Sequence, residues 1–107
     1  MSHSVFTPYY AVIFTSLKKN DSSDYSKMAV RMEELGRKQK GFLGIQSARN
    51  DSGFGITVSY WKTLEDISNW KNNMEHSEAQ NKGQSDWYLG YEVRICSVER
   101  EYTFGQL

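Results

Sequence analysis

One stretch near the N-terminus, Tyr9 to Ser16, limits most strongly what this chain can fold into. Its sequence, YYAVIFTS, is rich in β-branched and aromatic residues and predicts a β-strand. Both faces of this strand are apolar, with Tyr9, Ala11 and Ile13 on one and Tyr10, Val12 and Phe14 on the other. A sheet in a free-standing two-layer domain keeps one face in water. This sheet is therefore expected to be covered on both faces.

A helix and a hairpin are predicted to follow. Apolar residues at helical spacing indicate a helix that begins near Tyr25 and ends in the region 36–40. The turn residues 51–53 separate two predicted strands, 42–50 and 55–61. Because the connection is short, the two strands are expected to pair in antiparallel fashion.

A second helix is predicted after Thr63, which is a favourable N-cap residue. Glu65 and Asp66 follow in the first turn, where the helix dipole favours acidic side chains. An apolar stripe then recurs at intervals of three and four residues, at Leu64, Ile67, Trp70 and Met74. This stripe is expected to pack on the sheet.

The last predicted strand runs from Tyr91 to about Phe104. Its apolar positions change phase along the way, from Tyr91, Val93 and Ile95 to Val98, Tyr102 and Phe104. Such a change predicts a bulge near Cys96-Ser97, because side chains alternate between the two faces of a regular strand. The tail beyond the bulge is expected to leave its own sheet and to lie against a second copy of the chain.

The order strand-helix-strand-strand-helix-strand indicates an α+β, ferredoxin-like fold with an antiparallel four-stranded sheet. One domain is expected over residues 1–107, with an ordered core at about 9–104. Both helices pack on one sheet face in this arrangement. Since the other face is also apolar, a homodimer related by a two-fold axis is the simplest prediction.

Composition excludes several classes of protein. Thirteen basic residues balance thirteen acidic ones, which argues against a nucleic-acid partner or a charged membrane surface. No apolar run approaches the roughly 20 residues of a membrane span, and the N-terminus lacks the pattern of a signal peptide, so a cytoplasmic protein is expected. Cys96 is the single cysteine, which excludes an internal disulfide and a thiolate metal cluster. No metal site is predicted.

The run Gly55 to Lys62 (GITVSYWK), followed by Glu65, Ile67, Trp70 and His76, resembles the antibiotic biosynthesis monooxygenase (ABM) family. The segment 41–44 (GFLG) is similar to the start of that family's hairpin. The resemblance covers nearly the whole chain and implies a dimeric α+β barrel in which each unit encloses a cavity between sheet and helices. It also implies a cofactor-independent monooxygenase acting on a small aromatic or quinol-like substrate. Two alternatives are a non-catalytic small-molecule-binding dimer and a haem-binding or haem-degrading protein.

The haem-degrading branch of the family can be compared position by position. By its spacing from Trp61, the tryptophan of that branch corresponds to Trp70, and the haem-ligating histidine then falls at Gln80. Glutamine is a poor axial ligand for haem iron. The asparagine that the branch carries on its first strand falls within Ala11 to Phe14, where this chain is apolar. Haem degradation is therefore disfavoured, although His76 is an alternative ligand one helical turn before Gln80.

Cofactor-free oxygenation needs an apolar cavity, a proton acceptor, and donors that hold an oxyanion. His76 has the intrinsic pKa range to accept a phenolic proton near neutral pH, and Arg94 carries a charge that stabilises an anionic oxygen. These two are the candidate catalytic residues. The candidate substrate-binding residues are aromatic: Tyr60, Trp70, Trp87 and Tyr91.

Each candidate also has an ordinary structural interpretation. His76 lies between Glu75 and Glu78, as solvent-exposed histidines do, and Trp70 lies on an apolar stripe typical of core packing. Arg94 lies three positions after Tyr91. Because successive side chains of a regular strand alternate between its faces, the two are expected on opposite faces. A salt bridge to Glu92 or Glu101 is the alternative role of Arg94.

Overall fold

The computed structural model describes residues 6–19, 25–80 and 87–107, and for Met28 and residues 75–80 it describes the backbone alone. Within these residues the chain forms β1 (Tyr9–Lys18), α1 (Tyr25–Arg37), β2 (Phe42–Arg49), β3 (Phe54–Trp61), α2 (Leu64–Gln80) and β4 (Tyr88–Val98). The element order is the predicted one. The ferredoxin-like α+β fold is confirmed.

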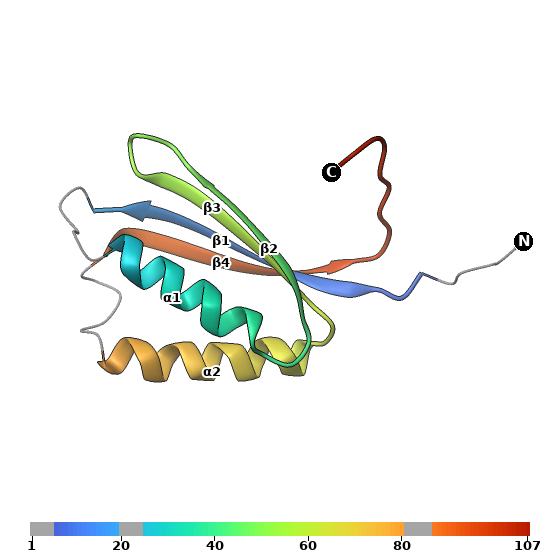
Figure 1. Cartoon of the computed structure of the whole chain (residues 1–107), viewed down its shortest axis with the longest axis horizontal. Coiled ribbons are helices and arrows are strands. Elements are labelled where there is room, and N and C mark those ends of the chain that lie inside the picture. Colours follow the sequence, from blue (N-terminus) through green and yellow to red (C-terminus); the bar gives the residue numbers. More distant parts are fainter. Residues whose placement is uncertain (1–5, 20–24, 81–86) are drawn as a thin grey trace, which may run out of the picture.

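The four strands form one antiparallel sheet in the order β2-β3-β1-β4. The most apolar strand, β1, lies at the centre, between β3 and β4. Both helices lie on one side of the sheet (Figure 1). The other side, which neither helix covers, is called the open face below.

The register assigns each residue to a face. Tyr10 of β1 pairs with Trp61 of β3, and residues directly opposite in an antiparallel pair share a face. Trp61 stacks on Trp70 of α2, so this is the face covered by the helices. The even-numbered residues of β1 therefore face the helices, while its odd-numbered residues lie on the open face. Both sets are apolar, as predicted.

The ends of the elements follow local chemistry. The Oγ1 of Thr63 accepts a hydrogen bond from the Asp66 backbone N–H at 3.0 Å, which confirms the predicted N-cap of α2. In the β2–β3 turn, the Asn50 carboxamide oxygen accepts bonds from the N–H groups of Ser52 and Phe54. Gly53 completes this turn with a φ of 94°, a conformation that favours glycine.

The prediction for β4 was wrong at both ends. The strand begins at Tyr88 and ends at Val98, and its irregularity lies where Leu17 and Lys18 pair with Gly90 and Tyr88. Leu89 is the extra residue there. Around Cys96 the pairing with β1 is regular, so the phase change in the sequence marks the end of the strand instead of a bulge. Residues 99–107 leave the sheet and are exposed (Figure 1).

No helix in the described part of the chain is both long and apolar enough to span a membrane.

Candidate functional site

Beneath β2 and β3, three rings form what is called here the tryptophan cluster: Phe42, Trp61 and Trp70. Trp61 is 0% exposed. Its ring centre lies 6.1 Å from that of Trp70, and the two ring planes are inclined at 24°, so the rings are stacked. Phe42 meets Trp61 edge-on at 5.5 Å. The Nε1–H of Trp61 donates to the Ser59 hydroxyl at 2.9 Å, which satisfies the polar atom that burial removes from water. The centre of this cluster is therefore closed to water, with Phe42 and Trp70 half-buried around Trp61.

Beneath β1 and β4, a second group of rings forms the tyrosine cluster: Phe14, Tyr25, Tyr88 and Tyr91. Its rings contact one another edge-on or at a tilt. The centre of the Phe14 ring lies 5.5 Å from that of Tyr88 and 5.2 Å from that of Tyr91. Tyr88 also contacts Tyr25 at 5.7 Å and Tyr91 at 6.0 Å. The cluster therefore joins β1, β4 and the first residue of α1.

Arg49, the last residue of β2, ties the tyrosine cluster to the hairpin. Its Nη2 donates to the Ser16 hydroxyl at 2.7 Å and to the Tyr25 hydroxyl at 2.9 Å, and its Nη1 donates to the Gly53 carbonyl. The guanidinium also lies 5.2 Å from the centre of the Tyr25 ring, a cation–π distance. It lies so close to Gly55 that a Cβ there would come within 2.6 Å of the Arg49 Cζ. Gly55 thus leaves the space that Arg49 fills.

Sequence reasoning missed Arg49 and Tyr25 as members of the site. A glycine predicted within a half-buried strand was the available signal, since it often marks close approach by another group.

The helix-facing side of β4 stays open in spite of its apolar residues. Tyr91, Val93 and Ile95 pair with Ser16, Phe14 and Val12, which places them on the face that the helices cover. They are nonetheless 44%, 49% and 53% exposed. This set is called the β4 strip. An exposed apolar strip beside a group of hydroxylated rings is suited to bind a flat aromatic molecule.

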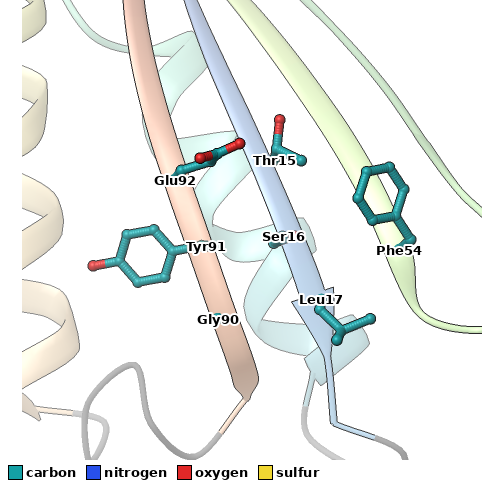
Figure 2. Close-up of a pocket in the computed structure, with 7 residues that line it drawn as sticks. All are labelled: Thr15, Ser16, Leu17, Phe54, Gly90, Tyr91 and Glu92. Carbon is teal, nitrogen blue, oxygen red and sulfur yellow. The ribbon is translucent and has the colours of Figure 1, made fainter.

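A shallow hollow of about 260 Å³ lies on the open face, between Leu17, Phe54, Thr15 and Glu92. It forms partly because Gly90, opposite Leu17, has no side chain. Figure 2 shows the Tyr91 ring directed away from Thr15, Leu17 and Phe54. Ser16 and Tyr91 also line the hollow. Because the Tyr91 ring is directed to the opposite side, the hollow opens on the face expected to contact a second copy.

The predicted site residues lie in different surroundings. Tyr91 belongs to the β4 strip, and Trp70 belongs to the tryptophan cluster. Trp87, 6% exposed, lies just before β4, where its carbonyl accepts a bond from the Lys19 N–H. His76 lies on α2, but its side chain is outside the described residues, as is that of Gln80.

Arg94 and Tyr60 lie on the open face. Arg94 is opposite Ile13, and its Nη1 lies 2.9 Å from the Glu92 carboxylate, with both side chains more than half exposed. The predicted separation of Arg94 from Tyr91 is thus observed. The Tyr60 hydroxyl donates to the Gln46 carboxamide oxygen at 3.0 Å, and its ring meets that of Tyr9.

One ionisable group on the open face, the Tyr9 hydroxyl, has a strongly raised pKa. The Tyr9 hydroxyl donates to the Glu101 carboxylate at 2.6 Å. This bond, together with burial and the negative charge of Glu101, raises the pKa of Tyr9 from 10.0 to about 12. No cluster of three or more His, Cys, Asp or Glu side chains suited to a metal ion occurs among the described residues.

The sequence profile of the antibiotic biosynthesis monooxygenase family matches residues 8–82. The chain belongs to this family. It is 46% identical over 97 residues to the uncharacterised protein YqjZ of Bacillus subtilis, an alignment that covers 91% of this chain and 85% of YqjZ.

Solved structures with the same fold have low sequence identity to this chain. One is described as a putative antibiotic biosynthesis monooxygenase from Nitrosomonas europaea, with a TM-score of 0.68, 14% identity, and coverage of 92% of this chain and 96% of that one. Another is SnoaB, a cofactor-independent oxygenase from Streptomyces nogalater, with a TM-score of 0.62, 9% identity, and coverage of 94% and 100%. At these identities the likeness establishes the fold.

Proposed function

We propose that this ABM protein is a cofactor-independent monooxygenase that acts on a small aromatic or quinol-like substrate. The observation that carries the proposal is the β4 strip, where Tyr91, Val93 and Ile95 face the helix layer and yet remain about half exposed. Exposed apolar side chains at such a position offer a binding surface for an aromatic ring. The description of SnoaB as a cofactor-independent oxygenase supports the type of reaction.

The proposed reaction converts a phenol into a para-quinone. The phenol first loses its hydroxyl proton, and the electron-rich phenolate then reduces O₂. One oxygen atom forms the new carbonyl in place of a ring hydrogen, and the other leaves as water with the two hydrogens of the substrate. The electrons come entirely from the substrate. The protein supplies an apolar surface, a proton acceptor and hydrogen-bond donors.

In this proposal His76 accepts the phenolic proton and Tyr91 binds the ring, while the buried Trp87 supports the start of β4. Trp70 supports the site through its stack on Trp61. Arg94 and Tyr60 lie on the open face, so they act on a ligand only where a second copy brings that face into the site.

The proposed assembly is a homodimer formed through the open face. Leu17, Phe54 and Ile56 lie on this face and are exposed in the single chain. Burying them in a two-fold contact removes apolar surface from water. Sedimentation at micromolar concentration is expected to give twice the chain mass, and a monomeric mass would contradict the dimer.

The enzymatic proposal is tested by oxygen uptake with a panel of quinols and polyphenols. The wild-type protein is expected to consume oxygen faster than buffer, with one ¹⁸O atom from ¹⁸O₂ retained in the product. His76→Ala is expected to lose this activity, whereas the matched control His3→Ala, at the chain's other histidine, keeps it. No uptake above buffer with the wild-type protein would exclude the proposed activity on these substrates.

Binding without turnover is the second candidate. The observation that favours it is the separation of Arg94 from Tyr91 by the sheet, which keeps a positive charge of this chain away from the β4 strip. In that case a ligand found by thermal-shift screening would be recovered chemically unchanged after incubation in air. Recovery of an oxygenated product would instead favour the enzyme.

A further inference from the structure

Residues 99–107, called here the C-terminal tail, leave the sheet with large apolar side chains exposed. Tyr102 is 85% exposed, Phe104 is 99% exposed and Leu107 is fully exposed. Single apolar residues on a surface are common, whereas several grouped together mark a contact surface. Covering these side chains with another apolar surface lowers the free energy, because it removes them from water.

The C-terminal tail lies on the same side of the sheet as the open face. The Tyr9 hydroxyl, on the open face, donates to the Glu101 carboxylate at 2.6 Å, which holds the third residue of the tail against β1. In Figure 1 the tail lies on the side of the sheet opposite the two helices. Tyr102 and Phe104 follow Glu101 in the tail, so they are presented to a molecule that covers the open face.

The hollow beside Leu17, called here the Leu17 hollow, is a suitable seat for one such side chain. Leu17 and Phe54, which Figure 2 shows on neighbouring strands, are 38% and 46% exposed, and Gly90 leaves the space between them and β4 without a side chain. Its volume of about 260 Å³ lies below the roughly 300–1,000 Å³ of sites that enclose small-molecule ligands. A second hollow of about 300 Å³, lined in part by Ala48 and Ile56, adjoins it at Phe54. Shallow apolar hollows of this size accommodate protruding side chains of another protein.

The tail is too short to seat Phe104 in the Leu17 hollow of its own chain. Val98, the last residue of β4, is opposite Tyr9, whereas Leu17 lies eight residues further along β1. At about 3.4 Å per strand residue, the hollow lies about 27 Å from the start of the tail. Phe104 is six residues beyond Val98, and six extended residues span at most about 22 Å. The turn back toward the hollow shortens this reach further.

A two-fold axis brings a different tail to the hollow. When the axis lies between two sheets and runs across their strands, the Val98 end of one sheet lies over the Leu17 end of the other. The tail of each copy then meets the Leu17 hollow of its partner, and the contact forms twice. Burying Tyr102 and Phe104 of both copies removes about 600–1,000 Å² from water, a large part of the roughly 1,200–2,000 Å² of a stable interface.

We propose that the C-terminal tail is an arm that seats Phe104 in the Leu17 hollow of a second copy. Tyr102 packs beside it on the apolar surface around Ile56. The bond between Tyr9 and Glu101 sets the direction in which the arm leaves its own sheet. This inference rests on the homodimer of the proposed function, and it adds the segment and the seat that make the interface self-complementary.

Disulfide trapping tests the contact. The Leu17→Cys/Phe104→Cys variant also carries Cys96→Ser, so the two introduced thiols are its only ones. In a glutathione redox buffer it is expected to form a covalent dimer, which gives twice the chain mass in the absence of reductant. Val30→Cys/Phe104→Cys in the same background is the control, because Val30 is 56% exposed but lies on α1, on the other side of the sheet. The control is expected to form no covalent dimer.

Sedimentation over a dilution series gives a second test that does not depend on thiols. Phe104→Ala is expected to raise the dissociation constant of the dimer about 100-fold, because each dimer loses two buried rings. Thr103→Ala is the matched control and is expected to change it less than about twofold, since successive side chains of an extended segment point in opposite directions. Phe104 is 99% exposed in the single chain, so its loss is not expected to alter folding, which circular dichroism checks.

The outcomes are distinct. A wild-type protein that sediments as a monomer overturns this inference together with the proposed dimer. A wild-type dimer whose Leu17→Cys/Phe104→Cys variant keeps free thiols, or closes a disulfide within one chain, overturns the arm and leaves the dimer intact. A dissociation constant unchanged by Phe104→Ala overturns the arm in the same way. Oxygen uptake by the wild-type protein tests the enzymatic proposal independently of these results.

Discussion

The tryptophan cluster and the tyrosine cluster lie under the same sheet and are built from similar rings, yet they differ in burial and in how their polar atoms are bonded. Trp61 is fully buried, and its single donor is satisfied within the protein by Ser59. In the tyrosine cluster, Tyr91 remains 44% exposed, and Tyr25 carries a hydroxyl held by a charged side chain. The first cluster is complete without a ligand, while the second presents polar groups at the edge of an open apolar strip.

The difference shows how one fold separates stability from binding. Close packing of buried rings whose donors are satisfied stabilises the fold. Hydroxylated and exposed rings contribute less to stability, and they leave groups that can bind other molecules. The helices thus bury Trp61 of β3 completely and leave Tyr91, Val93 and Ile95 of β4 about half exposed.

The largest expected contrast is between alanine substitutions in the two clusters. Trp61→Ala is expected to lower the free energy of unfolding by about 3–5 kcal/mol, since it leaves a large cavity in the core. Tyr91→Ala is expected to lower it by about 1 kcal/mol, because the ring is 44% exposed and its removal leaves no enclosed cavity. Urea titration followed by circular dichroism measures both. Equal losses would show that the two clusters do not differ in this way.

Alanine substitutions at two glycines beside the tryptophan cluster are expected to change the free energy of unfolding by smaller amounts and in opposite directions. Gly41 has a φ of 83°, and a Cβ there would overlap the buried Asp66 carboxylate, so Gly41→Ala is expected to destabilise by about 1–3 kcal/mol. Gly36 lies in α1, and its added methyl would make ordinary contact with Trp70 at 3.5 Å. Gly36→Ala is expected to stabilise by about 0.5 kcal/mol through helix propensity. Thermal melts of both variants measure the contrast, and a loss at Gly36 would indicate that Trp70 cannot adjust.

In the β4 strip, Val93→Ser is expected to change stability by no more than about 0.5 kcal/mol, because the side chain is half exposed. The same change is expected to weaken binding of 2-naphthol about fivefold through lost apolar contact. Val30→Ser is the matched control, since Val30 is 56% exposed, close to the 49% of Val93, but lies on α1. Equilibrium dialysis measures the affinities, and similar effects of the two variants would argue against a ligand on the strip.

Much of this fold could be predicted from the sequence because its signals are local. Element order followed from periodicity, the start of α2 from Thr63, and the opposite faces of Tyr91 and Arg94 from alternation along one strand. The end of β4 could not be predicted in this way. In the sequence, apolar residues beyond the end of a strand look the same as a change of phase within a longer strand. Only the pairing of β4 with β1 shows that the strand ends at Val98.

The tyrosine cluster could not be assembled from the sequence for a different reason. Arg49, Tyr25 and Tyr88 come from three elements, and no local pattern indicates that a residue at the end of a hairpin will bond the first residue of a helix. The aromatic residues near β4 were recognised as candidates from their type. Their contacts with Arg49 were found only in the tertiary structure.

The smallest expected effect concerns a tyrosine outside both clusters. Tyr25 faces a cation, whereas Tyr9 on the open face donates to the Glu101 carboxylate, which raises the pKa of Tyr9 from 10.0 to about 12. A folded-state pKa above the unfolded value favours the protonated form, so this bond contributes stability that is fully present below pH 10 and is lost as the pH rises through 12. Glu101→Gln removes the charge and is expected to return the pKa of Tyr9 toward 10.0. NMR of ¹³C-labelled tyrosine measures the titration, and Tyr9→Phe assigns the signal. Glu99→Gln is the neighbouring control, and a Tyr9 titration unchanged by Glu101→Gln would mean that the tail does not hold this contact in solution.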